Sequence, residues 1–381
     1  MEGSATAMRV PDPGIRYLFS REPSWQAWLD CEAELADAEA ELGMVPAEAA
    51  AEIRRKARLE LIDIKAVEDG LRVTGHPLVP LIWELSKICD GDAGGFVHWG
   101  ATTQNITQTG LLLQVQKAHR IILDQIRRIL TAQAALAEKT KDYALPGRTH
   151  GQHAVPATFG VKVAAWIDEF CRHVERLQQC EPRVFVAMLG GAAGTFASFG
   201  ELGQTLQDAY AKRLGMTSMP VPSRTTHDFA AEYTCILAMI GSSSARIAVE
   251  IFNGMKEEYG EVKEPIPAGT VGSSTMPQKR NPILCEAIFS LEAALRAQTM
   301  VALQSMQGEH EAATGYTQMT ARTLSESCGL LGDILERIVI LMEGLQVFPE
   351  RMRQNLDLSG GLIMSETLML ELAKHIGRQH A

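Results

Sequence analysis

The sequence predicts an all-α fold, and three observations support that prediction. The 381 residues are rich in Ala, Leu, Glu, Gln and Arg, which favour helices, whereas aromatic residues make up only 6%. Apolar residues recur at helical spacing over long stretches. No stretch of useful length alternates apolar and polar residues as a half-buried strand would. With 46% hydrophobic residues, the chain can bury a large core.

Six long segments carry the helical pattern. The first is followed by Gly43, a residue suited to ending a helix. The second runs without a proline and places apolar residues from Leu112 to Leu136 along one side. Helices of about 25 residues span roughly 35–40 Å, a length typical of a bundle. The predicted helices are Trp25–Leu42, Ile106–Tyr143, Pro156–Gln179, Ala230–Tyr259, Pro282–Gln307 and Thr320–Leu345.

The composition argues against several classes of protein. A formal net charge of −10 is unfavourable for a nucleic-acid partner, although local positive charge can still attract a small anion. No run is long and apolar enough to span a membrane, and the N-terminus lacks a secretory pattern. The seven cysteines are scattered, as in a reduced cytoplasmic protein. We therefore expect a cytoplasmic protein with no nucleic-acid or membrane partner.

The length suggests two or three domains, and two interruptions of the helical pattern lie within the chain. Residues 190–203 are rich in Gly and Ala, and residues 260–282 are rich in Gly, Pro and Ser. A connection as long as the second is usually functional or disordered. We expect an N-terminal helical domain at 1–100, a central bundle at 101–348, and the start of an incomplete C-terminal helical domain at 349–381.

The segment 272–282, GSSTMPQKRNP, gathers two serines, a lysine, an arginine and an asparagine before a predicted helix. Asn281 is a good N-cap and Pro282 suits the first helical position. Such a helix N-terminus beside Lys and Arg attracts an anion. The alternative is a polar linker with an ordinary cap. Glu286 favours a functional site, because a carboxylate on an apolar bundle helix is costly unless it is paired.

Two further polar stretches precede long helices. Residues 148–154, RTHGQHA, carry His150 and His153, which are candidates for acid–base work. Zinc held by two His and a Glu is the alternative, but no HExxH or CxxC spacing supports it, so we expect no metal. Residues 100–109, GATTQNITQT, are rich in hydroxyl and amide groups that can cap a helix, with Thr103 or Asn105 as N-cap, or bind a carboxylate.

Together these three stretches resemble the three conserved regions of the fumarase/aspartase superfamily. Within it, VHWGATTQ, GGAAGTFASF, GEHEAATG and NLDLSGGLIMSE are similar to the branch of 3-carboxy-cis,cis-muconate cycloisomerase and adenylosuccinate lyase. The resemblance implies a three-domain helical fold with a central five-helix bundle. It also implies a homotetramer whose active sites are each assembled from three subunits, with no metal or organic cofactor.

The resemblance also implies roles for individual residues. Ser273 matches the base that removes the proton beside a carboxylate. Lys279 and Asn281 match residues that hold that carboxylate as charge develops. His150 matches the acid that protonates the leaving group, and Glu286 matches its carboxylate partner. The residues that match substrate-binding positions are Thr102, Thr103, Gln104, Thr149 and His76.

One departure from the family pattern concerns residues 310–313, which read HEAA where the relatives have an arginine. This change argues against nucleotide binding, and Arg322 is a candidate substitute. In the other direction, His150 stands where many cycloisomerases lack a histidine, which favours elimination.

Three functions remain open at this level. The first is a β-elimination that converts an N-substituted aspartate into fumarate. The second is lactonising cycloisomerisation of carboxymuconate. The third is a non-enzymatic structural role, which the joint presence of Ser273, Lys279, Asn281, His150 and Glu286 argues against. We expect the substrate to be an anionic di- or tricarboxylate.

Overall fold

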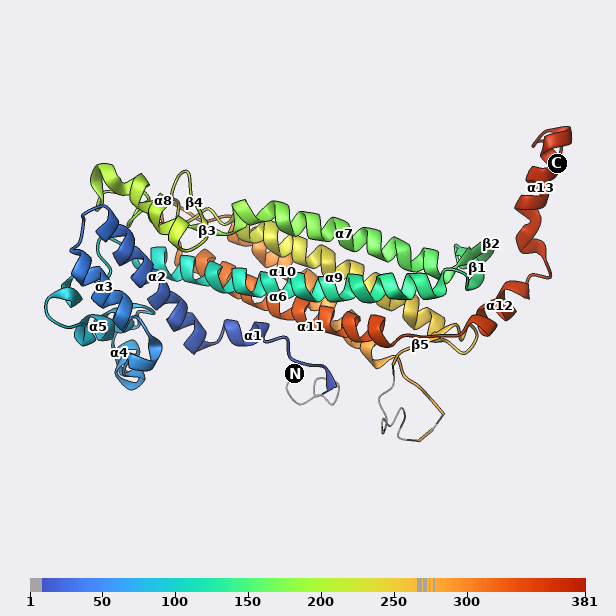
Figure 1. The fold of residues 1–381 in the computed structure, drawn as a ribbon, viewed down its shortest axis with the longest axis horizontal. Helices are drawn as coiled ribbons and strands as arrows, with labels where there is room; N and C mark the ends of the chain where they lie inside the picture. Colours follow the sequence, from blue (N-terminus) through green and yellow to red (C-terminus); the bar gives the residue numbers. More distant parts are fainter. Residues whose placement is uncertain (1–8, 266–268, 270–272, 274, 277) are drawn as a thin grey trace.

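The computed structural model describes residues 9–265, 269, 273, 275–276 and 278–381. They form a long helical bundle with a smaller helical head at one end (Figure 1). The all-α prediction is confirmed, and the predicted helices are present with ends displaced by a few residues. The bundle helices are α6 (Thr103–Thr140), α7 (Phe159–Val184), α9 (Asp228–Met255), α10 (Ile283–Ser305) and α11 (Thr314–Gly344).

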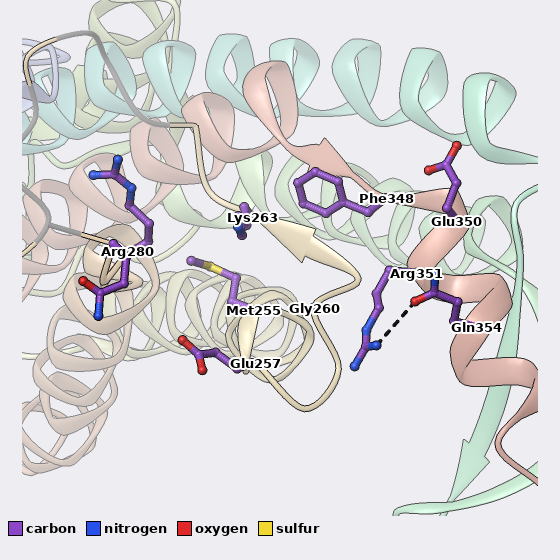
Figure 2. A pocket seen from close by; sticks show the side chains of 10 residues that line it. Met255, Glu257, Gly260, Lys263, Arg280, Phe348, Glu350, Arg351 and Gln354 are labelled. Atoms are coloured by element: carbon purple, nitrogen blue, oxygen red, sulfur yellow. Dashed lines mark hydrogen bonds between the residues drawn. The ribbon is translucent and has the colours of Figure 1, made fainter. Parts of the chain in front are cut away.

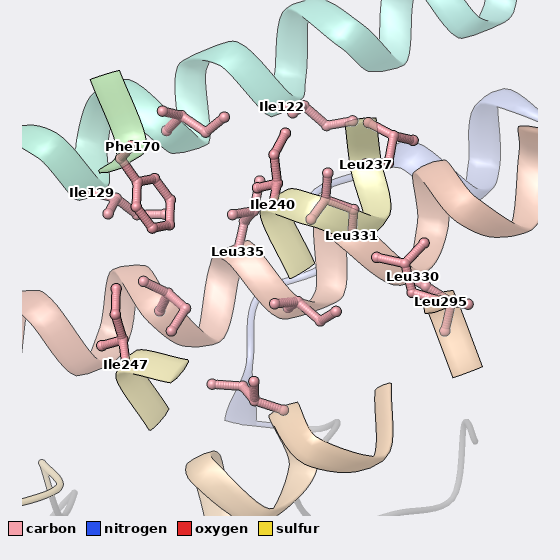
Figure 3. Close-up of a cluster of buried hydrophobic side chains, with 14 of the residues drawn as sticks. Ile122, Ile129, Phe170, Leu237, Ile240, Ile247, Leu295, Leu330, Leu331 and Leu335 are labelled. Carbon is pink, nitrogen blue, oxygen red and sulfur yellow. The ribbon is translucent and has the colours of Figure 1, made fainter. Parts of the chain in front are cut away.

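The core of the bundle is a continuous apolar cluster. Figure 3 shows side chains from all five bundle helices meeting there, and each labelled one is buried. Helix α9 contributes Leu237, Ile240 and Ile247 from one stripe, as the 3.6-residue period requires. Burial of these faces, at about 25 cal/mol per Å² of apolar surface, is the main force that holds the helices together.

The head has a second apolar cluster of its own. It is built from the N-terminal helices together with α8, which comes from the middle of the chain. The predicted boundaries at 100 and 348 stay predictions. The head elements are α2 (Arg21–Glu41), α3 (Ala47–Lys56), η2 (Leu59–Leu61), α4 (Ile64–Thr74), α5 (Val79–Ile88), η3 (Ala93–Phe96), η4 (Gly200–Leu202) and α8 (Gly203–Arg213), with α1 (Ile15–Leu18) lying along the bundle.

The structure contains a β-hairpin that the sequence analysis missed. Strand β1 (Ala144–Thr149) pairs antiparallel with β2 (Gln152–Thr158) at the end of the bundle far from the head (Figure 1). Prolines at 146 and 156 and Gly147 interrupt the alternation that would have revealed it. Helix α7 therefore begins after the hairpin, where the Thr158 hydroxyl accepts a hydrogen bond from the Val161 N–H.

The remaining four strands in the described residues are two residues long and form two separate pairs. Two further helices lie near the C-terminus. Strand β3 (Val186–Ala187) pairs with β4 (Thr217–Ser218), and β5 (Val262–Lys263) pairs with β6 (Gln346–Val347). Helices α12 (Pro349–Asp357) and α13 (Ser365–Ile376), with η5 (Leu362–Met364) between them, extend from the hairpin end (Figure 1).

Helix α9 corrects one expectation from the sequence. By length and composition alone it could cross a membrane, whereas the sequence analysis found no such run. In the structure α9 packs against α7, α10 and α11, and many of its residues are buried. A central bundle helix needs apolar residues on several sides, which accounts for its composition.

Candidate active site

The predicted site residues lie at opposite ends of the bundle. Thr102, Thr103 and Gln104 stand where α6 begins, beside the head. His150 lies at the far end, in the turn of the hairpin, and the connection that contains Ser273 joins β5 to α10 (Figure 1). Helix α6 separates the two groups by 38 residues, or about 57 Å at 1.5 Å per residue. One chain therefore cannot bring them together.

At the head end, a tight turn leads into α6. His98 and Gly100 both have positive φ, and a Cβ on Gly100 would come within 2.4 Å of the Phe199 ring. His98 Nδ1 lies 2.7 Å from the buried Glu32 carboxylate of α2. Burial alone would lower the pKa of His98, but the Glu32 charge raises it above its ordinary value. This pair fixes the turn against the head.

Thr102 and Thr103 have different surroundings. Thr102 is the N-cap of α6, and its N–H donates to Asn105 Oδ1 over 3.0 Å, so the cap falls one residue before the predicted Thr103. Thr103 Oγ1 lies 3.3 Å from His76 Nε2. Because His76 Nδ1 accepts the Val79 N–H at 3.3 Å, a neutral His76 carries its proton on Nε2 and donates it to Thr103.

The amide of Gln104 is already occupied within the chain. Its nitrogen donates to Gln108 Oε1 at 2.9 Å and to the Arg224 carbonyl at 2.7 Å, with Thr317 Oγ1 at 3.3 Å. Its oxygen accepts from Arg224 Nε at 3.0 Å. Gln104 thus orients Arg224, a residue that the sequence analysis did not select.

Arg224 is a half-buried cation beside the predicted carboxylate-binding residues. Its other guanidinium contact is the Ala192 carbonyl, and no carboxylate within the described part of the chain forms an ion pair with it. Desolvation by burial lowers its pKa. Arg322, the predicted candidate, is exposed on α11 and lines a cavity of about 290 Å³ with Gln108 and Thr317.

At the other end, the hairpin turn displays His150. His150 and Gly151 are the two turn residues between the paired Thr149 and Gln152, and both have positive φ, as a type I′ turn requires. Histidine tolerates this conformation better than most side chains. Thr149 and His150 are both exposed, so the turn presents them to whatever lies opposite.

Ser273 has a hydrogen-bonding pattern suited to a base. Its Oγ accepts hydrogen bonds from the backbone N–H groups of Thr275 at 3.3 Å and Met276 at 3.2 Å. Donors aimed at an oxygen favour its anionic form. Lys279 and Arg280 follow and are exposed. Gly272, Ser274 and Pro277 lie outside the described residues.

Helix α10 begins at Ile283 with Pro282 as its N-cap, one residue later than predicted. The Glu264 carboxylate lies at this helix N-terminus, where it accepts hydrogen bonds from two backbone N–H groups. Glu286 is in the first turn but exposed, so the premise that it lies on a buried face is wrong. Within the described residues no hydrogen bond or ion pair joins Glu286 to His150.

A cavity of about 490 Å³ lies near the start of α10 (Figure 2). Its lining includes three cationic residues, Lys263, Arg280 and Arg351, and two acidic residues, Glu257 and Glu350. It contains none of the predicted site residues. Across the described ranges, no group of three or more His, Cys, Asp and Glu side chains is placed to hold a metal ion.

Comparison with known proteins shows which enzymes this chain is similar to. The lyase family model matches residues 7–296. The chain is 39% identical over 376 residues to the adenylosuccinate lyase of Methanothermobacter thermautotrophicus, covering 98% of this chain and 84% of that one. It is 36% identical over 370 residues to the N-acetyl-S-(2-succino)cysteine lyase of Dickeya dadantii, covering 97% and 81%.

A solved structure agrees with these relatives. The 3-carboxy-cis,cis-muconate lactonizing enzyme from Pseudomonas putida is similar with a TM-score of 0.88 and 33% identity, covering 98% of this chain and 84% of that one. The family match spans well over half of the chain, and the relatives are similar along nearly all of it. The chain therefore belongs to the lyase family of the fumarase/aspartase superfamily and is an enzyme of that superfamily.

Proposed function

We propose that this enzyme converts an N-substituted aspartate, a succinyl-type dicarboxylate, into fumarate by β-elimination. The observation that carries the proposal is the pair of backbone N–H groups donating to Ser273 Oγ, because serine is a poor base unless its alkoxide is stabilised. Two of the relatives support the substrate class, since their names describe lyases of succinyl-type compounds.

The proposed reaction needs one base, one acid and charge stabilisation. Ser273 removes the proton beside one carboxylate, and the released electron pair forms the C=C bond as the C–N bond breaks. Lys279 and Asn281 stabilise the negative charge that develops on that carboxylate. His150 donates a proton to the departing nitrogen, and Glu286 orients it. These steps require no metal or organic cofactor.

We assign the second carboxylate of the substrate to the head end. Arg224 is the anchor, oriented by Gln104 and without a carboxylate partner in the described residues, so its guanidinium can accept a substrate carboxylate. Thr102 and Thr103 begin α6 beside Gln104 and supply hydroxyl groups, and His76, between α4 and α5, supplies an imidazole 3.3 Å from Thr103 Oγ1. Arg322 is the alternative anchor.

A complete site then requires more than one chain. The head-end residues and the hairpin-end residues are about 57 Å apart along α6, so the two groups meet only if chains pack side by side in opposite directions. We propose a cytoplasmic homotetramer whose active sites are shared between subunits.

The second candidate function is lactonising cycloisomerisation of carboxymuconate. The similarity to the Pseudomonas putida lactonizing enzyme favours it. An intramolecular addition has no departing nitrogen to protonate, so His150 is the residue that separates the two candidates.

A substrate screen tests both proposals. The purified enzyme is incubated with N-substituted aspartates, the S-substituted succinyl analogue and carboxymuconate, and absorbance in the ultraviolet follows fumarate formation or muconate loss. We expect fumarate from an N-substituted aspartate. Muconate loss without fumarate formation would favour the cycloisomerase instead.

A further inference from the structure

A four-residue segment, Glu261 to Glu264, follows α9 in the chain and contacts both the β1–β2 hairpin and the beginning of α10 through its side chains. Its two end residues are carboxylates that are almost completely buried, at 5% and 4% exposure. Between them, strand β5 pairs with β6 and so fixes the segment to the end of α11. Buried carboxylates are costly unless they are paired or hydrogen-bonded, so the partners of these two explain why they are here.

Glu264 caps α10. Its Oε2 accepts the Leu284 N–H at 3.1 Å, and its Oε1 accepts the Cys285 N–H at 2.8 Å. Both N–H groups belong to the first turn of a 23-residue helix, where they have no partner within the helix and the helix dipole favours a negative charge. Because Glu264 precedes the 265–282 connection and Leu284 follows it, this cap fastens the two ends of that connection together.

Glu261 holds the hairpin. Its carboxylate accepts two hydrogen bonds from Arg148, at 2.6 and 3.0 Å, and a third from Asn355 Nδ2 at 2.8 Å. The Arg148 guanidinium also lies 4.8 Å from the Tyr259 ring centre. Arg148 is in β1, two residues before His150. The fork-shaped contact therefore fixes the orientation of the strand that ends in the His150 turn.

We infer that Glu261 and Glu264 are positioning residues for the catalytic groups, acting through the hairpin and through α10. Glu261 sets where His150 is presented. Glu264 sets the first turn of α10, which carries Glu286 and directly follows Lys279 and Asn281. The inference rests on the proposed function, because only that function makes His150 and Ser273 catalytic. Neither carboxylate touches the substrate.

The test compares Glu264→Ala and Glu261→Gln with a matched control, Glu336→Gln. Glu336 is equally buried at 4% and accepts from Arg128 and Gln125, but it lies within α11 between bundle helices. All three changes should lower Tm. Only the first two should lower kcat, by about 10- to 100-fold, because small misplacements of catalytic groups are that costly. KM should change much less, and Glu264→Asp should restore part of kcat.

Hydrogen exchange supplies a readout that needs no substrate. Glu264→Ala should speed exchange at the Leu284 and Cys285 amides but not in the hairpin, and Glu261→Gln should do the reverse. If Glu261→Gln fails to fold, Arg148→Lys replaces it, since lysine keeps the charge but loses the two-pronged contact.

Normal kcat in folded Glu264→Ala, despite faster exchange, would overturn the positioning role. Unchanged exchange would overturn the cap itself. If the wild-type enzyme turns over none of the screened compounds, the proposed function fails, and the exchange pattern still decides whether the two carboxylates fix these elements.

Discussion

The hydroxyl oxygen of Ser273 accepts hydrogen bonds from two backbone N–H groups of its own segment, those of Thr275 and Met276. Two oriented N–H donors lower the cost of forming the alkoxide, and Lys279 and Arg280, which follow in the same segment, add positive charge to it. The same donors would be left without this acceptor if the oxygen were removed. Because the Ser273 side chain is small and only half-buried, removing its oxygen should affect catalysis much more than folding.

Replacing Ser273 by alanine should lower kcat by at least ~10² and leave folding intact, since the base is lost while the half-buried side chain contributes little to stability. Steady-state kinetics and circular dichroism measure the two effects. Ser290→Ala, on the exposed face of α10, is the matched control and should behave as wild type. Near-normal turnover by folded Ser273→Ala protein would refute the base assignment.

His150 and Glu286 should act as a unit in elimination. Each single change to alanine should cost about as much turnover as the double change, because residues that share one task are non-additive. A double-mutant cycle on an N-substituted aspartate measures this. On carboxymuconate, His150→Ala should keep its activity, because lactonisation has no leaving group to protonate. Simple addition of the two single losses would make Glu286 a structural residue.

Sequence reasoning selected residues in the three motifs that resemble the family's conserved regions, and it missed residues outside those motifs to which the structure draws attention. Ser273 and His150 stand in dense polar stretches before helices, so their residue types were visible. Arg224 lies in a comparable polar stretch, residues 223–228 leading into α9, which the sequence analysis did not select, and Glu264 lies in the 260–282 connection but outside its GSSTMPQKRNP part. Arg224 contacts the Gln104 amide, and Glu264 contacts the N-terminus of α10. Both contacts join residues that are distant in the sequence, so no local pattern predicts them.

At the scale of elements, the helices were predictable because each carries an apolar face of several turns. The β1–β2 hairpin was not, since each of its strands contains a proline that breaks the alternating pattern. The His150–Gly151 pair was the available signal, because glycine at the second position of a two-residue turn favours a hairpin. Helix α9 is long and apolar enough to cross a membrane by composition alone. Its packing against α7, α10 and α11 shows that these apolar residues belong to the bundle core.

Helix α2 contains a buried acid that makes stability depend on pH. Glu39 is fully buried, and neither of its oxygens has a partner in the described residues. Desolvation, with the negative charge of Glu32, raises the pKa of Glu39 to about 9. The folded state therefore keeps a proton that the unfolded state releases near its ordinary pKa of 4.5, so stability should fall as pH rises between these values.

Glu39→Gln should remove this loss, because an amide does not titrate. Its Tm should exceed that of the wild type at pH 8.5 by more than it does at pH 5.5, measured by thermal unfolding in matched buffers. Glu22→Gln, at an exposed position in the first turn of α2, controls for the change in net charge. Equal shifts at the two pH values would show that Glu39 is ionised in the folded protein.

At the scale of the whole molecule, helices α9 and α10 of the bundle carry large apolar side chains that are exposed in the single chain. Met300 is 72% exposed and Leu303 52%, both on α10, and Met239 on α9 is 43% exposed. Apolar side chains gathered on one face are typical of an interface. Together with the separation of the site residues by α6, this surface favours assembly of several chains, as the proposed function requires.

Mixing inactive subunits tests this architecture directly. If each site takes His150 from one chain and Ser273 from another, random hybrids of His150→Ala and Ser273→Ala chains should contain about one quarter of sites with both residues intact. Activity should therefore reappear in hybrids made by refolding the two variants together, although each variant alone is inactive. If one chain supplied both residues, every site would lack one of them and no activity would return.

A second mixture serves as a control for effects of mixing that do not depend on shared active sites. Ser273 and Lys279 belong to the same segment, so each site receives both from one chain. Hybrids of Ser273→Ala and Lys279→Ala should therefore stay inactive, however well they assemble. Light scattering must show the same oligomer in both mixtures. Recovery in the first mixture alone locates the division of the active site between the hairpin and the start of α10, and recovery in both would mean that mixing merely stabilises the variants.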